Sequence, residues 1–248
     1  SDQVWRPCYA LPVERYFLSF LDDTCSNPRI AYAASFGTEN CEFSSNQILD
    51  CRKLLQKFSF VSVREQSGVE ICKQLFGVRA SHLLDPTLLL SKDDYLKLIQ
   101  NQKPSKGNLM VYVLDETPDI QVFISQVAAS EKLTPFNTIN SLENCLGMLQ
   151  LPVENWLRGF VDAKLIITDS FHACVFAIIF NKPFICIGNN ERGMSRFHSL
   201  LDLFGLQHCL LNEKQSFEIP KINWKKVNIK LEELRKQSLA CIKHALIA

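Results

Sequence analysis

The sequence predicts an α/β fold of parallel sheets with helices on their faces. The first observation is a repeated unit, in which a short apolar run is followed by a polar turn and then by a helical pattern. The second is the stretch 164–190, where strand, polar turn, buried helix and strand follow one another directly. The third is size, because 248 residues with 47% hydrophobic content are enough for two modest α/β domains.

The chain begins with a stretch that has little periodicity. Residues 1–6 are expected to be the end of a strand and its loop. Residues 29–34 are the next predicted strand, and a glycine-containing turn follows them. Ser44 and Gln47 have the spacing of a capping box, so a helix is expected to begin after Ser44.

A second strand and helix follow at once. Residues 60–63 are a predicted strand, and Arg64 lies at its polar carboxyl end. Ser67 and Glu70 have the spacing of a second capping box, which predicts that the next helix begins at Ser67. A third short strand is expected at residues 82–84. It should end at the following Asp85-Pro86, because proline interrupts regular pairing.

The best candidate for a linker is the segment 100–108. It is polar, it contains proline and glycine, and it has no apolar period. We therefore expect a first domain over residues 1–103 and a second domain over residues 104–248. The second domain is predicted to contain a strand at 109–114, helices at 117–128, 153–161 and 197–204, and one long carboxyl-terminal helix at 224–247.

The long final helix has more basic than acidic side chains. Such a charge run usually marks the solvated face of a helix, which is the interpretation we adopt. The alternative is contact with a membrane surface or a polyanion.

Residues 164–168 are predicted to be a buried strand, and residues 171–180 a helix that is apolar except at His172. Asp169 or Ser170 is the expected N-cap. His172 would then lie in the first helical turn at the carboxyl edge of a parallel sheet. Open α/β sheets bind ligands at this edge, where helix amino ends present positive dipoles. The alternative is that His172 caps or packs locally.

Composition excludes several classes of protein. A net charge of +1 with 21% charged residues gives no overall basic field for nucleic acid. The ten cysteines are scattered without a C-x-x-C pair, which indicates reduced thiols in a cytoplasmic protein. No apolar run is long enough to cross a bilayer, and no metal-ligand spacing or phosphate-binding glycine motif is present.

Three arginines are candidates for binding an anion. Arg64 follows a predicted strand, and Arg192 and Arg196 flank a glycine in the loop after the strand at 184–188. An arginine offers a fixed fork of donors to carboxylate or phosphate. The alternatives are an ion pair between Arg64 and a carboxylate such as Glu65, and solvation of the two loop arginines.

Taken together, six segments resemble the polysaccharide pyruvyl transferase family. In chain order they are SDQVW, RIAYAASFG, VSVREQSG, LLDPTLLL, IITDSFHACVFAIIFNKPFI and RGMSRFHSLL, and they span nearly the whole sequence. The resemblance implies two Rossmann-like domains in a GT-B-like arrangement, with the active site in the cleft between them. Members of the family usually have a further stretch before the first segment. The first domain is therefore expected to be incomplete in this chain.

The resemblance also implies a reaction and its residues. The family transfers the pyruvyl group of phosphoenolpyruvate to sugar hydroxyls as a cyclic ketal. His172 matches its histidine, as the catalytic residue, and Arg64 matches the arginine of its R-E-x-S segment. Many relatives have an arginine-leucine pair before the histidine, whereas this chain has Ser170 and Phe171 in the TDSFH variant. Further substrate-binding candidates are Asp169, Asp2, Arg192 and Arg196, and either of these arginines is a candidate to replace the missing cation.

The chemistry needs these residue types. Phosphoenolpyruvate is a small polyanion that requires cations and helix-end N–H groups. An imidazole can donate a proton in one step and accept one in another. We expect no metal or cofactor, a sugar acceptor that is a glycan or is linked to a lipid or nucleotide, no nucleic acid, and at most peripheral membrane contact. The alternatives are a GT-B glycosyltransferase that uses a nucleotide sugar, and a module that binds sugars or anions without catalysis.

Overall fold

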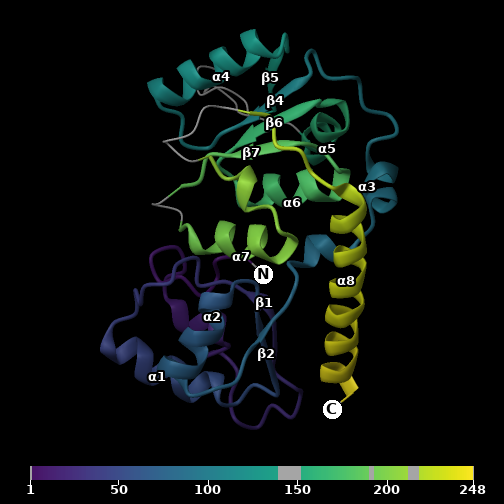
Figure 1. The fold of residues 1–248 in the computed structure, drawn as a ribbon. Coiled ribbons are helices and arrows are strands. Elements are labelled where there is room, and N and C mark those ends of the chain that lie inside the picture. Colours follow the sequence, from purple (N-terminus) through teal and green to yellow (C-terminus); the bar gives the residue numbers. More distant parts are fainter. Residues whose placement is uncertain (1, 139–151, 190–192, 212–217, 248) are drawn as a thin grey trace. The chain divides into compact units, whose positions relative to one another are not determined.

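The computed structural model describes residues 2–138, 152–189, 193–211 and 218–247. Its strands form two parallel sheets, with helices packed around them (Figure 1). The chain divides into two compact units. The first consists of Ser1–Leu89, Asn190–Phe204 and Asn228–Ala248, and the second of Leu90–Asn189 and Gly205–Val227. The predicted α/β fold with parallel sheets in two groups is confirmed.

The sheet of the first unit has three parallel strands in the order β1-β2-β3. They are β1 (Ile30–Ala34), β2 (Phe60–Val63) and β3 (Ser81–His82). Residues 2–6 form turns rather than the predicted end of a strand. They are tied to the end of β1, because Trp5 N donates to Ser35 O at 3.1 Å and Ser35 N donates to Asp2 O at 3.3 Å.

The helices of the first unit show one correct and one wrong sequence prediction. Helix α1 (Ser45–Leu55) begins after Ser44, which forms the predicted capping box with Gln47. Helix α2 (Gln66–Ile71) has Glu65 as its N-cap, so the predicted capping box of Ser67 and Glu70 is wrong. The physical reason is that the amide of Gln66 finds its acceptor elsewhere, in the hydroxyl of Ser199 at 3.1 Å.

Helix α2 continues into a π-helical turn, Cys72–Phe76, that ends at Gly77. Beneath it lies an aromatic core that the sequence did not reveal. Its members are Trp5, Phe17, Phe36, Phe43 and Phe76, which pack ring against ring with centroids 4.8 to 6.1 Å apart. The short helix Val13–Phe17 supplies one of these rings and was likewise not predicted.

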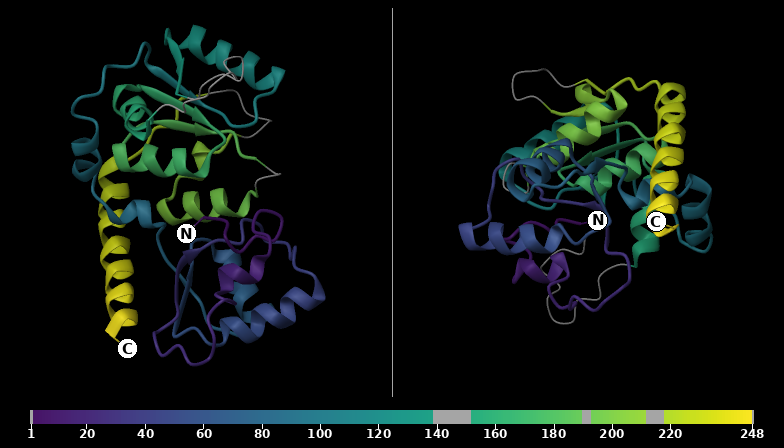
Figure 2. Two further views of the ribbon diagram at one scale, coloured as in Figure 1. Left: turned by 180° about the vertical axis from the view of Figure 1, so that it is seen from behind. Right: turned by 90° about the horizontal axis from the view of Figure 1, so that it is seen from below.

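Two later helices contribute to the first unit. Helix α7 (Ser195–Phe204) is joined to it by a hydrogen bond from Ser195 Oγ to Gly37 O at 3.4 Å. Helix α8 (Trp224–Ile247) is one continuous helix, shown in yellow in Figure 2. Its Ser238 Oγ accepts from Leu84 N at 3.3 Å, and Arg235 Nε donates to Leu88 O at 2.9 Å. This grouping differs from a single boundary between residues 103 and 104.

The sheet of the second unit has four parallel strands in the order β5-β4-β6-β7. They are β4 (Leu109–Tyr112), β5 (Pro135–Asn137), β6 (Leu165–Thr168) and β7 (Phe184–Cys186). Tyr112, Thr168 and Cys186 lie side by side in the register, so three strands end together at one edge. The accompanying helices are α3 (Lys92–Leu98), α4 (Pro118–Ser130), α5 (Val153–Asp162) and α6 (Phe171–Phe180). Strand β5 and helix α3 were not predicted.

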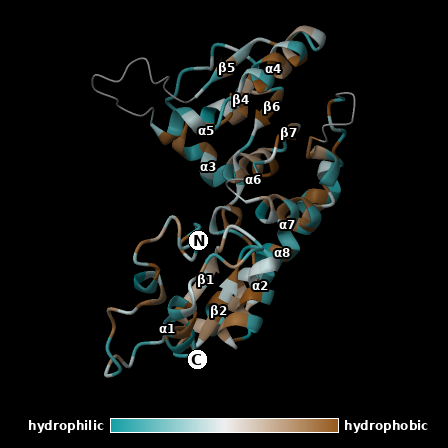
Figure 3. Cartoon of the chain, turned by 90° about the vertical axis from the view of Figure 1, so that its left-hand side faces the viewer, coloured by the Kyte–Doolittle hydropathy of each residue, from teal (hydrophilic) through white to brown (hydrophobic). Residues whose placement is uncertain are grey.

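Helix α6 has the predicted bounds, with Ser170 as N-cap. Every residue of α6 except His172 is buried, as expected for a helix with ten almost wholly apolar residues. Phe176 packs edge-on against Tyr95 and Trp156, with ring centroids 4.9 Å apart in both pairs. Hydrophobic residues, brown in Figure 3, lie along the strands and the helix faces that cover them.

Two further features are the character of the helices and the state of the cysteines. In the part of the chain that the structure describes, no helix is both long and apolar enough to cross a bilayer. The nine described cysteines are all free thiols, and Cys51, Cys72, Cys174, Cys186 and Cys209 are buried.

Candidate active site

His172 lies in the first turn of α6, directly beyond the carboxyl end of β6. Its ring packs edge-on against that of Phe171, with centroids 5.5 Å apart. The imidazole is half-buried, whereas the other side chains of the helix are buried. An ionisable side chain is thus held at a sheet edge by a helix whose remaining residues anchor it in the core.

Ser170 and Phe171 have structural roles at the start of this helix. Ser170 Oγ accepts from Ala173 N at 3.4 Å, which satisfies one of the first amides of α6. The side chain of Phe171 is buried. These contacts orient His172, and the predicted binding of substrate by Ser170 and Phe171 stays a prediction.

Asp169 connects the ends of neighbouring strands. Its buried carboxylate accepts from two consecutive amides in the loop after β4, Leu114 N at 2.7 Å and Asp115 N at 3.1 Å. Asn189, which follows β7, donates to the same carboxylate at 3.4 Å and to Asp115 at 2.6 Å. Asp169 therefore fixes three loops around the start of α6, and no sequence motif indicated its partners Asp115 and Asn189.

Arg64 lies at the carboxyl end of β2 in the first unit, and its side chain is 0% exposed. Nη1 donates to Asp85 Oδ2 at 3.0 Å and Nη2 donates to Asp2 Oδ1 at 3.2 Å. Asp85 in turn accepts from the amide and hydroxyl of Thr87, at 3.0 and 2.7 Å. The side chain of Asp2 is 73% exposed, so the buried guanidinium forms a hydrogen bond to a carboxylate at the surface.

The sequence suggested Glu65 only as an ion-pair partner of Arg64. Its carboxylate is fully buried, with Oε2 3.9 Å from Arg64 Nε. Oε1 accepts from Ser35 Oγ at 3.0 Å, Phe36 N at 2.6 Å and Gly37 N at 3.1 Å. Burial raises the pKa of Glu65, and the positive charge of Arg64 together with these donors opposes the rise.

Arg196, in the first turn of α7, is a second buried cation of the first unit. Burial and then the charge of Arg64 lower the pKa of Arg196 to about 10, while Glu65 and Asp2 act in the opposite direction. The guanidinium is therefore charged at neutral pH, and an added anion would stabilise it.

The structure thus gathers the predicted residues into two groups, each within one unit. Asp169, Ser170, Phe171 and His172 surround the start of α6, whereas Asp2, Arg64 and Arg196 belong to the charged cluster of the first unit. Arg192 lies outside the described residues. Within residues 2–138, 152–189, 193–211 and 218–247, no three His, Cys, Asp or Glu side chains are placed to hold a metal ion.

The arrangement offers proton transfer in one unit and charge stabilisation in the other. His172 supplies an imidazole beside the positive end of a helix dipole. Arg64 and Arg196 supply guanidinium groups in surroundings where an anion gains more than in water. Asp85 was missed because its pairing with Arg64 joins residues 21 positions apart.

Comparison with known proteins gives a family and several distant structures. The family model described as polysaccharide pyruvyl transferase matches residues 1–191. Wall teichoic acid polymerase TagF matches with a TM-score of 0.36 and 12% identity over 88% of this chain and 61% of its own. The glycosyltransferase of kitacinnamycin matches with a TM-score of 0.38 and 11% identity over 98% of this chain and 60% of its own. This chain spans about three-fifths of the length of both. No curated protein sequence matches it.

The first prediction concerns the buried pairs of Arg64. Arg64→Lys should destabilise the protein by about 3 to 5 kcal/mol, because an ammonium cannot reach both Asp85 and Asp2 and leaves buried charge uncompensated. Urea unfolding measures the change. The control is Arg79→Lys, at an exposed arginine of the same unit, which should change stability by less than about 0.5 kcal/mol. Equal effects of the two substitutions would contradict the structural role of Arg64.

The second prediction concerns the pH dependence caused by Glu65. A carboxyl whose pKa is raised in the folded state binds more protons there than in the unfolded chain. Its contribution therefore makes the protein less stable as pH rises from the unfolded pKa to the folded one. Glu65→Gln should remove this component, so that the wild type loses stability relative to the variant above pH 4.5. Urea midpoints at several pH values test this, and parallel curves would contradict it.

Proposed function

The chain belongs to the polysaccharide pyruvyl transferase family, and we propose that it transfers the pyruvyl group of phosphoenolpyruvate to two hydroxyls of a sugar as a ketal. The acceptor is a glycan or a sugar linked to a lipid or nucleotide, in bacterial-type polysaccharide or cell-surface glycan biosynthesis. The reaction takes place in the cytoplasm and uses neither metal nor cofactor.

The observation that supports this proposal most strongly is the position of His172. An imidazole in the first turn of a buried helix, beyond the end of a parallel strand, is held where ligands of α/β sheets bind. The residue lies within the segment that matches the family model. Its half-buried ring can exchange protons with a bound substrate.

The proposed reaction requires one proton donor and two proton acceptors. The methylene carbon of phosphoenolpyruvate gains a proton and becomes a methyl group, which leaves positive charge at the neighbouring carbon. A first sugar hydroxyl bonds to that carbon and loses its proton, and the bond to phosphate then breaks. A second hydroxyl closes the ketal. Of the two hydroxyl protons, one balances the proton added to carbon and the other leaves with phosphate.

His172 is proposed to give the proton to the methylene carbon and to take one from an attacking hydroxyl. A single imidazole can do both, because it can donate a proton in one step and accept one in another. The positive end of α6 would favour the carboxylate and phosphate of the donor. Asp169 and Ser170 hold the helix start in place through the bonds described above.

Arg196 is the proposed cation that replaces the arginine other family members have before the histidine. Burial and then the neighbouring charge of Arg64 disfavour its positive charge, so a bound anion would relieve an existing cost. Binding of the donor by Arg64 stays a prediction, and its hydrogen bond positions Asp2. Arg192 stays a further candidate outside the described residues.

The cytoplasmic setting rests on cysteine chemistry. The nine described cysteines are free thiols, and two of them, Cys8 and Cys41, are exposed. Exposed free thiols are typical of a reducing compartment.

We predict that His172→Gln lowers kcat by about 10²- to 10⁴-fold, the usual worth of a general acid or base. Affinity for phosphoenolpyruvate should change little, because charge recognition is assigned to other groups. Phosphate release in the presence of candidate acceptors, with mass spectrometry of the ketal product, measures the rate. His208→Gln, at an exposed histidine, is the matched control and should retain full activity. Wild-type turnover in His172→Gln would refute the assigned role.

We further predict that Arg196→Gln weakens phosphoenolpyruvate binding about tenfold or more, because a charge-assisted contact is lost. Calorimetric titration of the chain with phosphoenolpyruvate measures this, and Arg79→Gln is the control at an exposed arginine. Titration with a UDP-sugar is run beside it. Affinity for the UDP-sugar with none for phosphoenolpyruvate would overturn the proposed donor in favour of a glycosyltransferase.

A further inference from the structure

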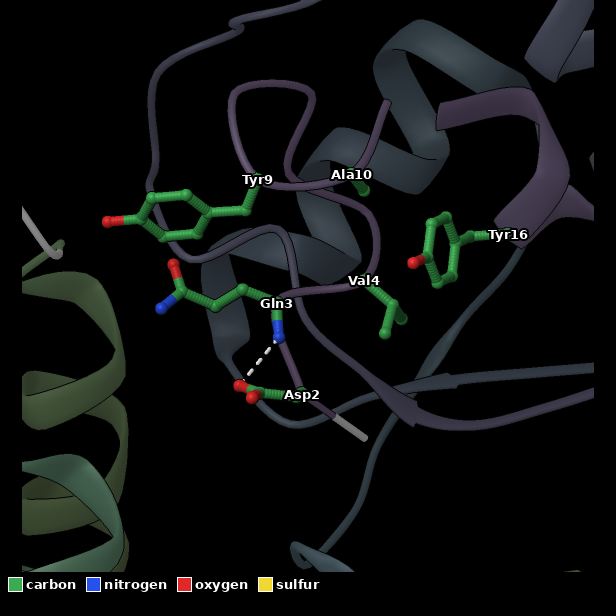
Figure 4. Close-up of a pocket in the computed structure, with 6 residues that line it drawn as sticks. All are labelled: Asp2, Gln3, Val4, Tyr9, Ala10 and Tyr16. Atoms are coloured by element: carbon green, nitrogen blue, oxygen red, sulfur yellow. Dashed lines mark hydrogen bonds between the residues drawn. The ribbon is translucent and has the colours of Figure 1, made fainter. Parts of the chain in front are cut away.

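The first unit contains a surface pocket of about 400 Å³ whose role is not explained by the donor chemistry. It is lined by Asp2, Gln3, Val4, Tyr9, Ala10 and Tyr16 (Figure 4). Its volume lies in the range of small-ligand sites. Asp2 is both a lining residue and the exposed partner of buried Arg64. The pocket therefore borders the charged cluster of the same unit.

Buried neighbours hold the backbone of Tyr16 and the ring of Tyr9 in place. Trp5 Nε1 donates to Tyr16 O at 3.1 Å, and the Trp5 ring stacks on Phe17 with centroids 4.8 Å apart. Arg6 lies over the ring of Tyr9, with its guanidinium carbon 4.7 Å from the ring centroid. Arg6 itself is fixed by Glu42 at 2.8 Å. The walls of the pocket are thus preorganised rather than loose surface side chains.

Both rings nevertheless remain open to solvent, since Tyr9 is 55% exposed and Tyr16 is 47% exposed. Single exposed aromatic residues are common and need no explanation. Two aromatic rings on one pocket, beside a carboxylate and an amide side chain, form a more specific combination. Aromatic rings pack against the C–H groups of a pyranose, while carboxylate and amide groups bind its hydroxyls.

The charge of the lining residues indicates which of the two substrates of the proposed reaction suits the pocket. Among the described residues that line this pocket, none is lysine or arginine and one is acidic. Phosphoenolpyruvate or a nucleotide phosphate would therefore meet no lining cation in the pocket, and the charged group that it would meet is the carboxylate of Asp2. A neutral polyol has no such cost.

We infer that this pocket binds the pyranose ring of the sugar acceptor, with Tyr9 and Tyr16 as walls and Asp2 as the acceptor of hydroxyl hydrogen bonds. The inference rests on the proposed function, because it assigns a place to the second substrate of that reaction. The pairing of Asp2 with Arg64 fixes the carboxylate that receives the sugar. Gln3 also lines the pocket and offers a second polar side chain, whose Oε1 accepts from Arg6 Nη1 at 3.2 Å.

The test is saturation-transfer NMR of the full chain with the methyl glycosides of glucose, galactose, mannose and N-acetylglucosamine. At least one glycoside should receive saturation at its ring protons. Tyr9→Ala and Tyr16→Ala should each weaken its binding about five- to tenfold, whereas Tyr16→Phe should bind like the wild type because the ring is retained. Phe20→Ala removes an aromatic residue that is 69% exposed but does not line the pocket, and it should have no effect.

Absence of saturation transfer to all four glycosides would overturn the inference, as would transfer that survives both Tyr→Ala substitutions. Phosphoenolpyruvate affinity is measured on the same samples. Glycoside binding that depends on the tyrosines, without affinity for phosphoenolpyruvate, would refute the pyruvyl donor but leave the sugar site. The reverse result would refute the sugar site and leave the donor.

Discussion

The carboxyl edge of the first sheet depends on one buried charge, the guanidinium of Arg64. It hydrogen-bonds to Asp85 after β3 and to Asp2 near the start of the chain, and it lies beside Glu65. A buried guanidinium is costly unless carboxylates surround it, so the positions of all three acids follow from its presence. The same arrangement orients Asp2 outward, which gives a surface carboxylate the fixed geometry that a binding site needs.

Both units use the same device to hold loops at the sheet edge. Glu65 follows β2 and accepts from the consecutive amides of Phe36 and Gly37, after neighbouring β1. Asp169 follows β6 and accepts from the consecutive amides of Leu114 and Asp115, after neighbouring β4. In each unit a buried acid just before a helix satisfies backbone donors that would otherwise lose their hydrogen bonds. A rigid edge is the common result.

Local patterns in the sequence were sufficient for much of the fold. The ten residues before Asn181, apolar except for His172, predicted α6 with its bounds, since its cap and stop are encoded next to it. The capping box of Ser67 and Glu70 failed because Ser199, far along the chain, supplies the first acceptor of α2. The partners of Arg64 and the pocket of Tyr9 and Tyr16 likewise depend on contacts between distant segments. Periodicity and capping signals describe neighbours in sequence and contain no information on such pairs.

The distribution of thiols makes the core beneath His172 open to chemical probing. Cys174 lies two residues further along α6, and burial raises its pKa well above the ordinary value for a thiol. An alkylating reagent attacks the thiolate, so it should modify exposed Cys8 and Cys41 in the native protein and reach Cys174 only through an opening of the helix. The rate of alkylation at Cys174 would therefore report how often the support of the imidazole opens, without any engineered label.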